Sequence, residues 1–188
     1  MTDSSRTQHE AGPRRAAADQ PETWPGSPLG RVLRSGDNAR LEFRRDYPVP
    51  VDDLWAAVTE SDRLARWIGT WTGRARVGAT VQFQMRHEPE PCEPEPVTIT
   101  ECGPPHRLAV VWQVPGEKPW HVELTIAAGP GGSSLVFVQR LSDGISVSDV
   151  GAGWHWYLDR LTAVLGGGTP PEWAPYPPAL TEAYARLG

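Results

Sequence analysis

The 188-residue chain lacks the features that mark several large classes of protein. It has no run of about 18 consecutive apolar residues, so the sequence predicts no membrane-spanning helix. Its formal net charge of −5 also gives it no basic excess with which to attract nucleic acid or anionic lipid. We therefore expect no nucleic-acid partner and no membrane span. A small molecule or a protein partner that is not basic fits this charge better.

Other signals are also missing. The stretch up to Gly30 contains no apolar segment of the kind that a secretory signal needs, so we expect a cytoplasmic protein. There are only two cysteines, Cys92 and Cys102, which we interpret as free thiols. The glycine clusters GPGG and GGG lack the Lys and Ser/Thr of a phosphate-binding loop and the spacing of a dinucleotide fingerprint. They are predicted to be turns, and no cofactor is expected.

Composition and hydrophobic periodicity divide the chain into three segments. Residues 1–36 are rich in Ala, Arg, Pro, Gly and Ser without a hydrophobic period, so they are predicted to be a disordered tail. Residues 37–168 are predicted to form one domain, and residues 169–188 a proline-rich extension that packs on it. A short helix is expected from about Pro178 at the end of this extension.

The domain begins with a strand and two short helices. Leu41 and Phe43 alternate with charged residues, as in a half-buried strand. A helix is predicted to start after Pro50, and a second one to run from Ser61 to the glycine at position 69.

From residue 70 to residue 141 the apolar period changes to two. Turn signals divide this region into six antiparallel strands, the first two of which form a hairpin at Gly78. The segment SVSDVGAGWHWYLDRLTAVLGGG then predicts a long amphipathic helix. The expected fold is α+β: a curved antiparallel sheet of seven strands around a long C-terminal helix, with two short helices after the first strand.

Three stretches and this order of elements resemble a known superfamily. The stretches are RRDYPVPVDDLWAAVTESDRLARWIG, GWHWYLDRL and WAPYPPALTEAYARL, which bracket nearly the whole chain after about residue 39. They resemble the helix-grip (SRPBCC) superfamily, which includes START lipid-transfer domains, polyketide cyclases and Bet v-type allergens. Within it they are most similar to the bacterial relatives of the activator of heat-shock-protein ATPase (Aha-type). The resemblance implies the helix-grip fold and places the connections HEPEPCEPEP and PGEKP at the mouth of a pocket.

Several polar residues are candidates for a metal or catalytic site. HEPEPCEPEP offers His87 and Cys92, but its prolines spread side chains around the chain, so we expect a stiff acidic loop and no metal site. His155 and Asp159 stand four residues apart, a spacing typical of a surface pair. Neither His155 nor His121 has a Ser or Cys nucleophile nearby in sequence, so no catalytic residue is predicted. By alternation Glu101 faces either an apolar pocket or, at the strand end, water.

The strongest lead is a set of apolar and aromatic residues expected on the concave sheet face and the facing helix. A solid core fits the same pattern, and the surplus of Trp favours a cavity slightly. The predicted lining consists of Phe83, Met85, Ile99, Val110, Trp112, Trp120, Val122, Leu124, Trp154, Tyr157, Leu158 and Leu161.

Three functions follow as hypotheses. The first is binding of a small hydrophobic or aromatic molecule between sheet and long helix, without catalysis. The second is an enzyme similar to polyketide cyclases that uses the same cavity. The third, implied by the Aha-type resemblance, is activation of a chaperone ATPase or another protein-interaction role.

Overall fold

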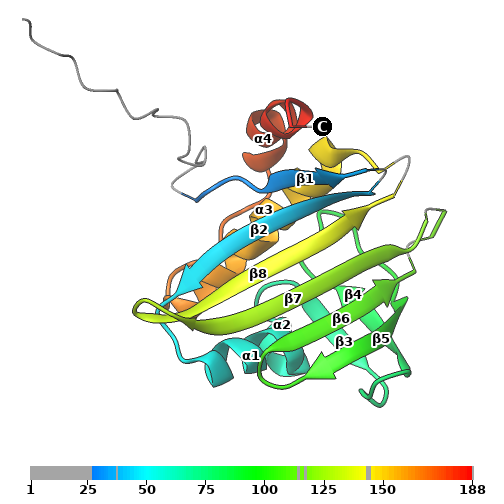
Figure 1. The fold of residues 1–188 in the computed structure, drawn as a ribbon, viewed down its shortest axis with the longest axis vertical. Helices are drawn as coiled ribbons and strands as arrows, with labels where there is room; N and C mark the ends of the chain where they lie inside the picture. Colours follow the sequence, from blue (N-terminus) through cyan, green and yellow to red (C-terminus); the bar gives the residue numbers. More distant parts are fainter. Residues whose placement is uncertain (1–26, 37, 114, 117, 143–144, 188) are drawn as a thin grey trace, which may run out of the picture.

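The structure of the chain is a computed structural model that describes residues 27–36, 38–113, 115–116, 118–142 and 145–187. The predicted disorder of residues 1–26 lies outside this part. Within it, eight strands form one antiparallel sheet in the order β1-β2-β8-β7-β6-β5-β4-β3. Helices lie behind one face of the curved sheet, and the other face is uncovered in Figure 1.

The elements follow one another along the chain as the sequence predicts, with one strand added at the start. The strands are β1 (Arg31–Ser35), β2 (Asn38–Tyr47), β3 (Gly69–Thr72), β4 (Thr80–Met85), β5 (Glu95–Gly103), β6 (Arg107–Trp112), β7 (Trp120–Gly129) and β8 (Gly132–Leu141). The helices are α1 (Val51–Thr59), α2 (Ser61–Leu64), α3 (Val147–Leu165) and α4 (Tyr176–Ala185).

The long helix α3 packs across one half of the sheet. Its Leu158 and Leu161 are completely buried, as are Leu41 of β2 and, nearly, Leu135 of β8. The pairing of β2 with β8 brings the first long strand beside the last one and so completes the surface on which α3 lies. This arrangement confirms the predicted α+β helix-grip fold.

The predicted number of strands was seven, one fewer than the structure shows. The additional strand β1 comes from residues that the sequence assigned to the disordered tail, and it pairs with β2 from Arg31 to Ser35. Its five residues include two arginines and make too short a pattern to reveal a strand. The neighbouring strand β2 supplies the hydrogen bonds that hold it.

The predicted hairpin around Gly78 is also shorter than expected. β3 ends at Thr72, and the chain then loops to β4 through Gly73 and Gly78, whose φ angles of +117° and +80° favour glycine. Residues 73–79 therefore form a loop at the end of the sheet, where the sequence predicted the continuation of a strand.

Candidate functional site

A cavity of about 250 Å³ lies between the sheet and the two short helices. Its floor comes from the inward side chains of β4 to β8, and its far wall comes from α1, α2 and β3. The long helix α3 contributes one lining residue, Trp154. The cavity therefore lies mainly under α1 and α2, whereas the sequence placed it under the C-terminal helix.

Seven of the twelve predicted lining residues do line this cavity. They are Phe83, Ile99, Val110, Trp112, Val122, Leu124 and Trp154. Trp112 is the centre of the aromatic group, because its ring contacts Phe83 with centroids 4.9 Å apart and Trp154 with centroids 6.3 Å apart. Their role in binding a ligand stays a prediction.

The other five predicted residues lie outside the cavity wall. Leu158 and Leu161 are fully buried in the core under α3. Trp120 and Met85 are partly buried and pack against the core, and the ring of Trp120 contacts those of Trp112 and Trp154 with centroids 6.2 and 6.3 Å apart. Tyr157 is buried and donates a hydrogen bond to Glu88. Beyond Trp154, the predicted α3 residues thus fill the core and do not border the cavity.

Sequence reasoning missed most of the far wall. The missed lining residues include Trp55, Val58, Thr59, Leu64, Trp67 and Trp71. Two of these indoles are fixed by backbone carbonyls: Trp67 Nε1 donates to Ala57 O and Trp71 Nε1 donates to Thr59 O, both at 2.9 Å. The helical spacing of Trp55 and Val58 showed that they face inward, but it did not show which part of the sheet they face.

A bulge in β5 decides which polar groups reach the cavity. The register shifts between Ile99 and Glu101, so strict alternation ends there, and of the two predicted positions of Glu101 the structure shows the one that faces water. Glu101 is exposed and accepts a hydrogen bond from Arg107 Nε at 2.7 Å, while the next residue, Cys102, lines the cavity. Cys102 is an exposed free thiol. With the exposed Pro104 it marks the side on which the cavity meets solvent.

The loop HEPEPCEPEP is tied to the domain by its ends. Glu88 accepts a hydrogen bond from the Tyr157 hydroxyl at 2.7 Å, and Glu95 accepts one from Trp112 Nε1. Burial lowers the pKa of His87, whose Nε2 lies 3.0 Å from the carbonyl oxygen of Ala65. Among the residues that the structure describes, no group of three or more His, Cys, Asp or Glu side chains could hold a metal ion.

His155 and Asp159 are not the surface pair that their spacing suggested. The His155 side chain is fully buried, and its Nε2 lies 3.4 Å from Asp159 Oδ2. Tyr184 of α4 lies 2.9 Å from His155 Nδ1, and Tyr176 donates to Asp159 at 3.0 Å. The pair therefore lies where α4 packs on α3, away from the cavity.

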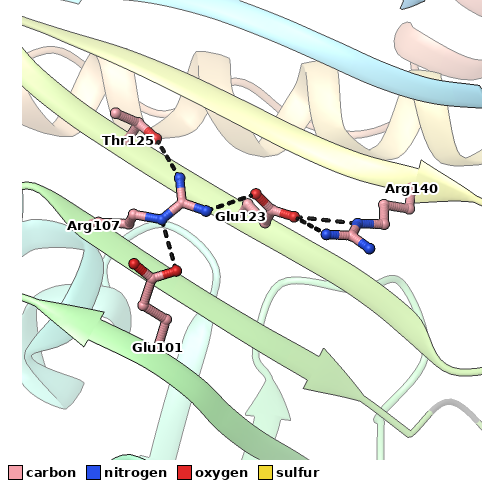
Figure 2. Close-up of polar contacts among 5 residues, drawn as sticks. All are labelled: Glu101, Arg107, Glu123, Thr125 and Arg140. Carbon is pink, nitrogen blue, oxygen red and sulfur yellow. Dashed lines mark hydrogen bonds and ion pairs between the residues drawn. The ribbon is translucent and has the colours of Figure 1, made fainter. Parts of the chain in front are cut away.

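The uncovered face of the sheet carries a chain of charges, shown in Figure 2. Arg107 donates to Glu101 and, through Nη2, to Glu123 at 3.1 Å, and Arg140 donates to the other oxygen of Glu123 at 2.7 Å. The hydrogen bond from Arg140, with the positive charges of Arg140 and Arg107, holds the pKa of Glu123 below its ordinary value despite partial burial.

Several solved structures share this fold, whereas no curated protein matches the sequence. CalU16 from Micromonospora echinospora is 28% identical, with 85% of this chain and 94% of that chain covered and a TM-score of 0.67. DynU16, from the dynemicin biosynthetic locus, is 24% identical, with 70% of this chain and 48% of that chain covered and a TM-score of 0.62. EF2215 from Enterococcus faecalis, a conserved protein of unknown function, is 19% identical, with 85% and 92% covered and a TM-score of 0.64.

A family model extends this likeness from the fold to the sequence. It matches residues 48–166, from the end of β2 to the end of α3, and is described as Activator of Hsp90 ATPase homolog 1-like protein. None of the described helices is long and apolar enough to cross a membrane. The match covers well over half of the chain and includes both short helices, β3 to β8 and α3. The chain therefore belongs to the Activator of Hsp90 ATPase homolog 1-like family, within the SRPBCC superfamily.

Proposed function

We propose that the protein binds a small hydrophobic or aromatic molecule in the cavity between the sheet and helices α1 and α2. The observation that carries this proposal is a cavity of about 250 Å³ whose wall is almost entirely apolar. An apolar cavity of about 150 Å³ is enough to hold benzene, and pockets for drug-sized ligands begin at about 300 Å³. The volume therefore suits a ligand of about two rings or a short acyl chain.

The chemistry of the wall supports binding without catalysis. Among its described lining residues there is no carboxylate and no imidazole, the groups that most often move protons in enzymes. The carboxylate of Glu101 points to the other face of the sheet. A cyclase-like enzyme in the same cavity would have to work without these groups, so we propose a binding protein.

Tryptophan fluorescence tests the proposal directly. Five of the nine tryptophans line the cavity, so a bound ligand should change a large part of the emission. We expect saturable quenching by flat aromatic or acyl-chain compounds. Val110→Phe should abolish it, because the added ring fills the space that a ligand would take.

The matched control is the next residue. Val111 lies on the same strand but faces the opposite side of the sheet, where its partner in β5 is Thr98. Val111→Phe should keep the quenching of the unchanged protein. Equal quenching in Val110→Phe, with the fold intact by circular dichroism, would show that any ligand binds elsewhere.

The family match favours a second function, a protein-interaction role. The description of the family refers to an activator of the Hsp90 ATPase. The uncovered face of the sheet carries alternating positive and negative side chains that a protein partner could contact (Figure 2). The test is the ATPase rate of a bacterial Hsp90 with and without the protein. If the proposal is right, the rate rises with the unchanged protein and rises less with Glu123→Lys, which reverses the central charge. An unchanged rate at saturating protein would rule this function out.

A further inference from the structure

The indole N–H groups around the cavity are already used within the protein. Trp67 and Trp71 donate theirs to backbone carbonyl oxygens of α1, at 2.9 Å in each case. Trp112 donates to a carboxylate oxygen of Glu95. Trp154 donates to the amide oxygen of the fully buried Gln139. Four of the five indoles in the wall therefore offer a ligand only ring carbon.

The remaining polar side chains of the wall are few. Apart from the indoles, the described lining includes two of them, Thr59 and Cys102. Thr59 is half-buried, and its hydroxyl donates to the carbonyl oxygen of Trp55 at 2.7 Å. Cys102 is exposed beside Pro104. A polar group deep in the cavity would thus lose its water, and among the described lining side chains only the partly exposed indole of Trp55 has an N–H group that is not already donated within the protein.

We infer that the cavity selects ligands whose enclosed part carries no hydrogen-bonding group, such as a fused aromatic or alicyclic ring system, and holds any polar substituent at the mouth near Cys102. This inference rests on the proposed binding function and names the ligand class. Burying a hydroxyl without a partner weakens binding by about 10- to 100-fold, since its hydration is lost and nothing replaces it. When a ligand with a polar group at each end binds, only the group at the mouth stays in water, and the other group is enclosed by the apolar wall.

Three probes of equal ring size test the rule by isothermal titration calorimetry. They are naphthalene, 2-naphthol and 2,6-dihydroxynaphthalene. The single hydroxyl of 2-naphthol can stay at the mouth, so its Kd should lie within a few-fold of that of naphthalene. One hydroxyl of the diol must enter the cavity, so the diol should bind about 10- to 100-fold more weakly than 2-naphthol.

Two substitutions on one strand make the test specific to the cavity. Val110→Thr adds a hydroxyl to the wall and should narrow the gap between the diol and 2-naphthol several-fold. Val111→Thr adds the same group on the opposite face and should leave the gap unchanged. Equal narrowing by both variants would overturn the assignment of the effect to the wall.

The outcomes separate this inference from the function on which it rests. If the diol binds as tightly as 2-naphthol, ligand binding stands and the selectivity rule is wrong. If none of the three probes binds, both the proposed binding function and the rule fail. If Val110→Thr does not fold, the ratio measured with the unchanged protein still decides.

Discussion

Two glycines of α3 provide a sharp test of how the C-terminal helix is seated. A Cβ atom added at Gly151 would lie 2.5 Å from Cγ and 2.6 Å from Cδ1 of the Tyr184 ring. A Cβ atom added at Gly153 would meet nothing within 4 Å. Both residues are inside α3, so Gly151→Ala and Gly153→Ala gain the same helical preference and differ in the contact with α4.

The expected changes have opposite signs. Replacing Gly by Ala in a helix interior raises the free energy of unfolding by about 1 kcal/mol, and this should be the whole effect of Gly153→Ala. At position 151 overpacking lowers it by about 1 to 3 kcal/mol. The Tyr184 ring cannot simply move away, because it is fully buried and its hydroxyl accepts a hydrogen bond from Gly30 N at 2.9 Å. Loss of that hydrogen bond costs about 1 kcal/mol more, which the gain of about 1 kcal/mol in helical preference offsets. Gly151→Ala should therefore lower the free energy of unfolding by about 1 to 3 kcal/mol in total.

Urea denaturation of the full chain measures both variants. For a chain of this size a change of 1 kcal/mol also shifts the Tm by about 2 to 4 °C, so thermal unfolding provides a second reading. Gly151→Ala should become stabilising relative to its own background when it is combined with Tyr184→Ala, which removes the ring. An increase in stability of equal size for both single variants would refute the seating of α4 on α3.

Two further predictions concern polar contacts outside the cavity. In urea titrations, Glu123→Gln should lower the free energy of unfolding by about 1 kcal/mol in low salt and by less in 1 M salt, because Glu123 pairs with both Arg107 and Arg140. Glu101→Gln removes only the exposed ion pair with Arg107, so it should change the free energy of unfolding by less than about 0.5 kcal/mol. Because folding lowers the pKa of Glu123, the ionised side chain stabilises the protein above the ordinary pKa of glutamate, and this stabilisation is lost as the pH falls through the lowered pKa. The difference in free energy of unfolding between Glu123→Gln and the unchanged protein should therefore vanish at the lowest pH. A difference that persists there would contradict this assignment. Tyr157→Phe removes the hydrogen bond to Glu88, so it should lower the free energy of unfolding by about 1 kcal/mol and speed amide hydrogen exchange in residues 86–95. Unchanged exchange in these residues would mean that other contacts hold the loop.

The fold could be predicted because its signals are local. Alternation along β4 to β8, the helical spacing of apolar residues in two short helices and one long apolar stripe each follow from neighbouring residues, and their order leaves few ways to cover the sheet. The error at β1 has the same origin. Five residues with two arginines carry no local signal, and the strand exists because β2 offers it a partner.

The site was harder to predict because it depends on contacts between distant residues. Alternation identified the sheet floor, including Trp112 and Val122, but failed at the bulge after Ile99, where Glu101 and Cys102 exchange faces. No periodicity could show that α1 and α2 cover the open part of the sheet. The burial of His155 likewise depends on Tyr184, which lies 29 residues further along the chain.

The position of the tryptophans explains why the core is filled under one half of the sheet and hollow under the other. Under α3, flexible aliphatic side chains such as Leu158 and Leu161 pack to full burial against β2. Under α1 and α2, Trp67 and Trp71 are bound to backbone carbonyls, so their rings cannot turn into the space between helix and sheet without breaking a hydrogen bond. Because a cavity closes only as far as its wall can relax, anchored rings keep this one open. Substitutions under α3 should therefore affect mainly stability, and substitutions that release the anchored rings should affect mainly the volume available to a ligand.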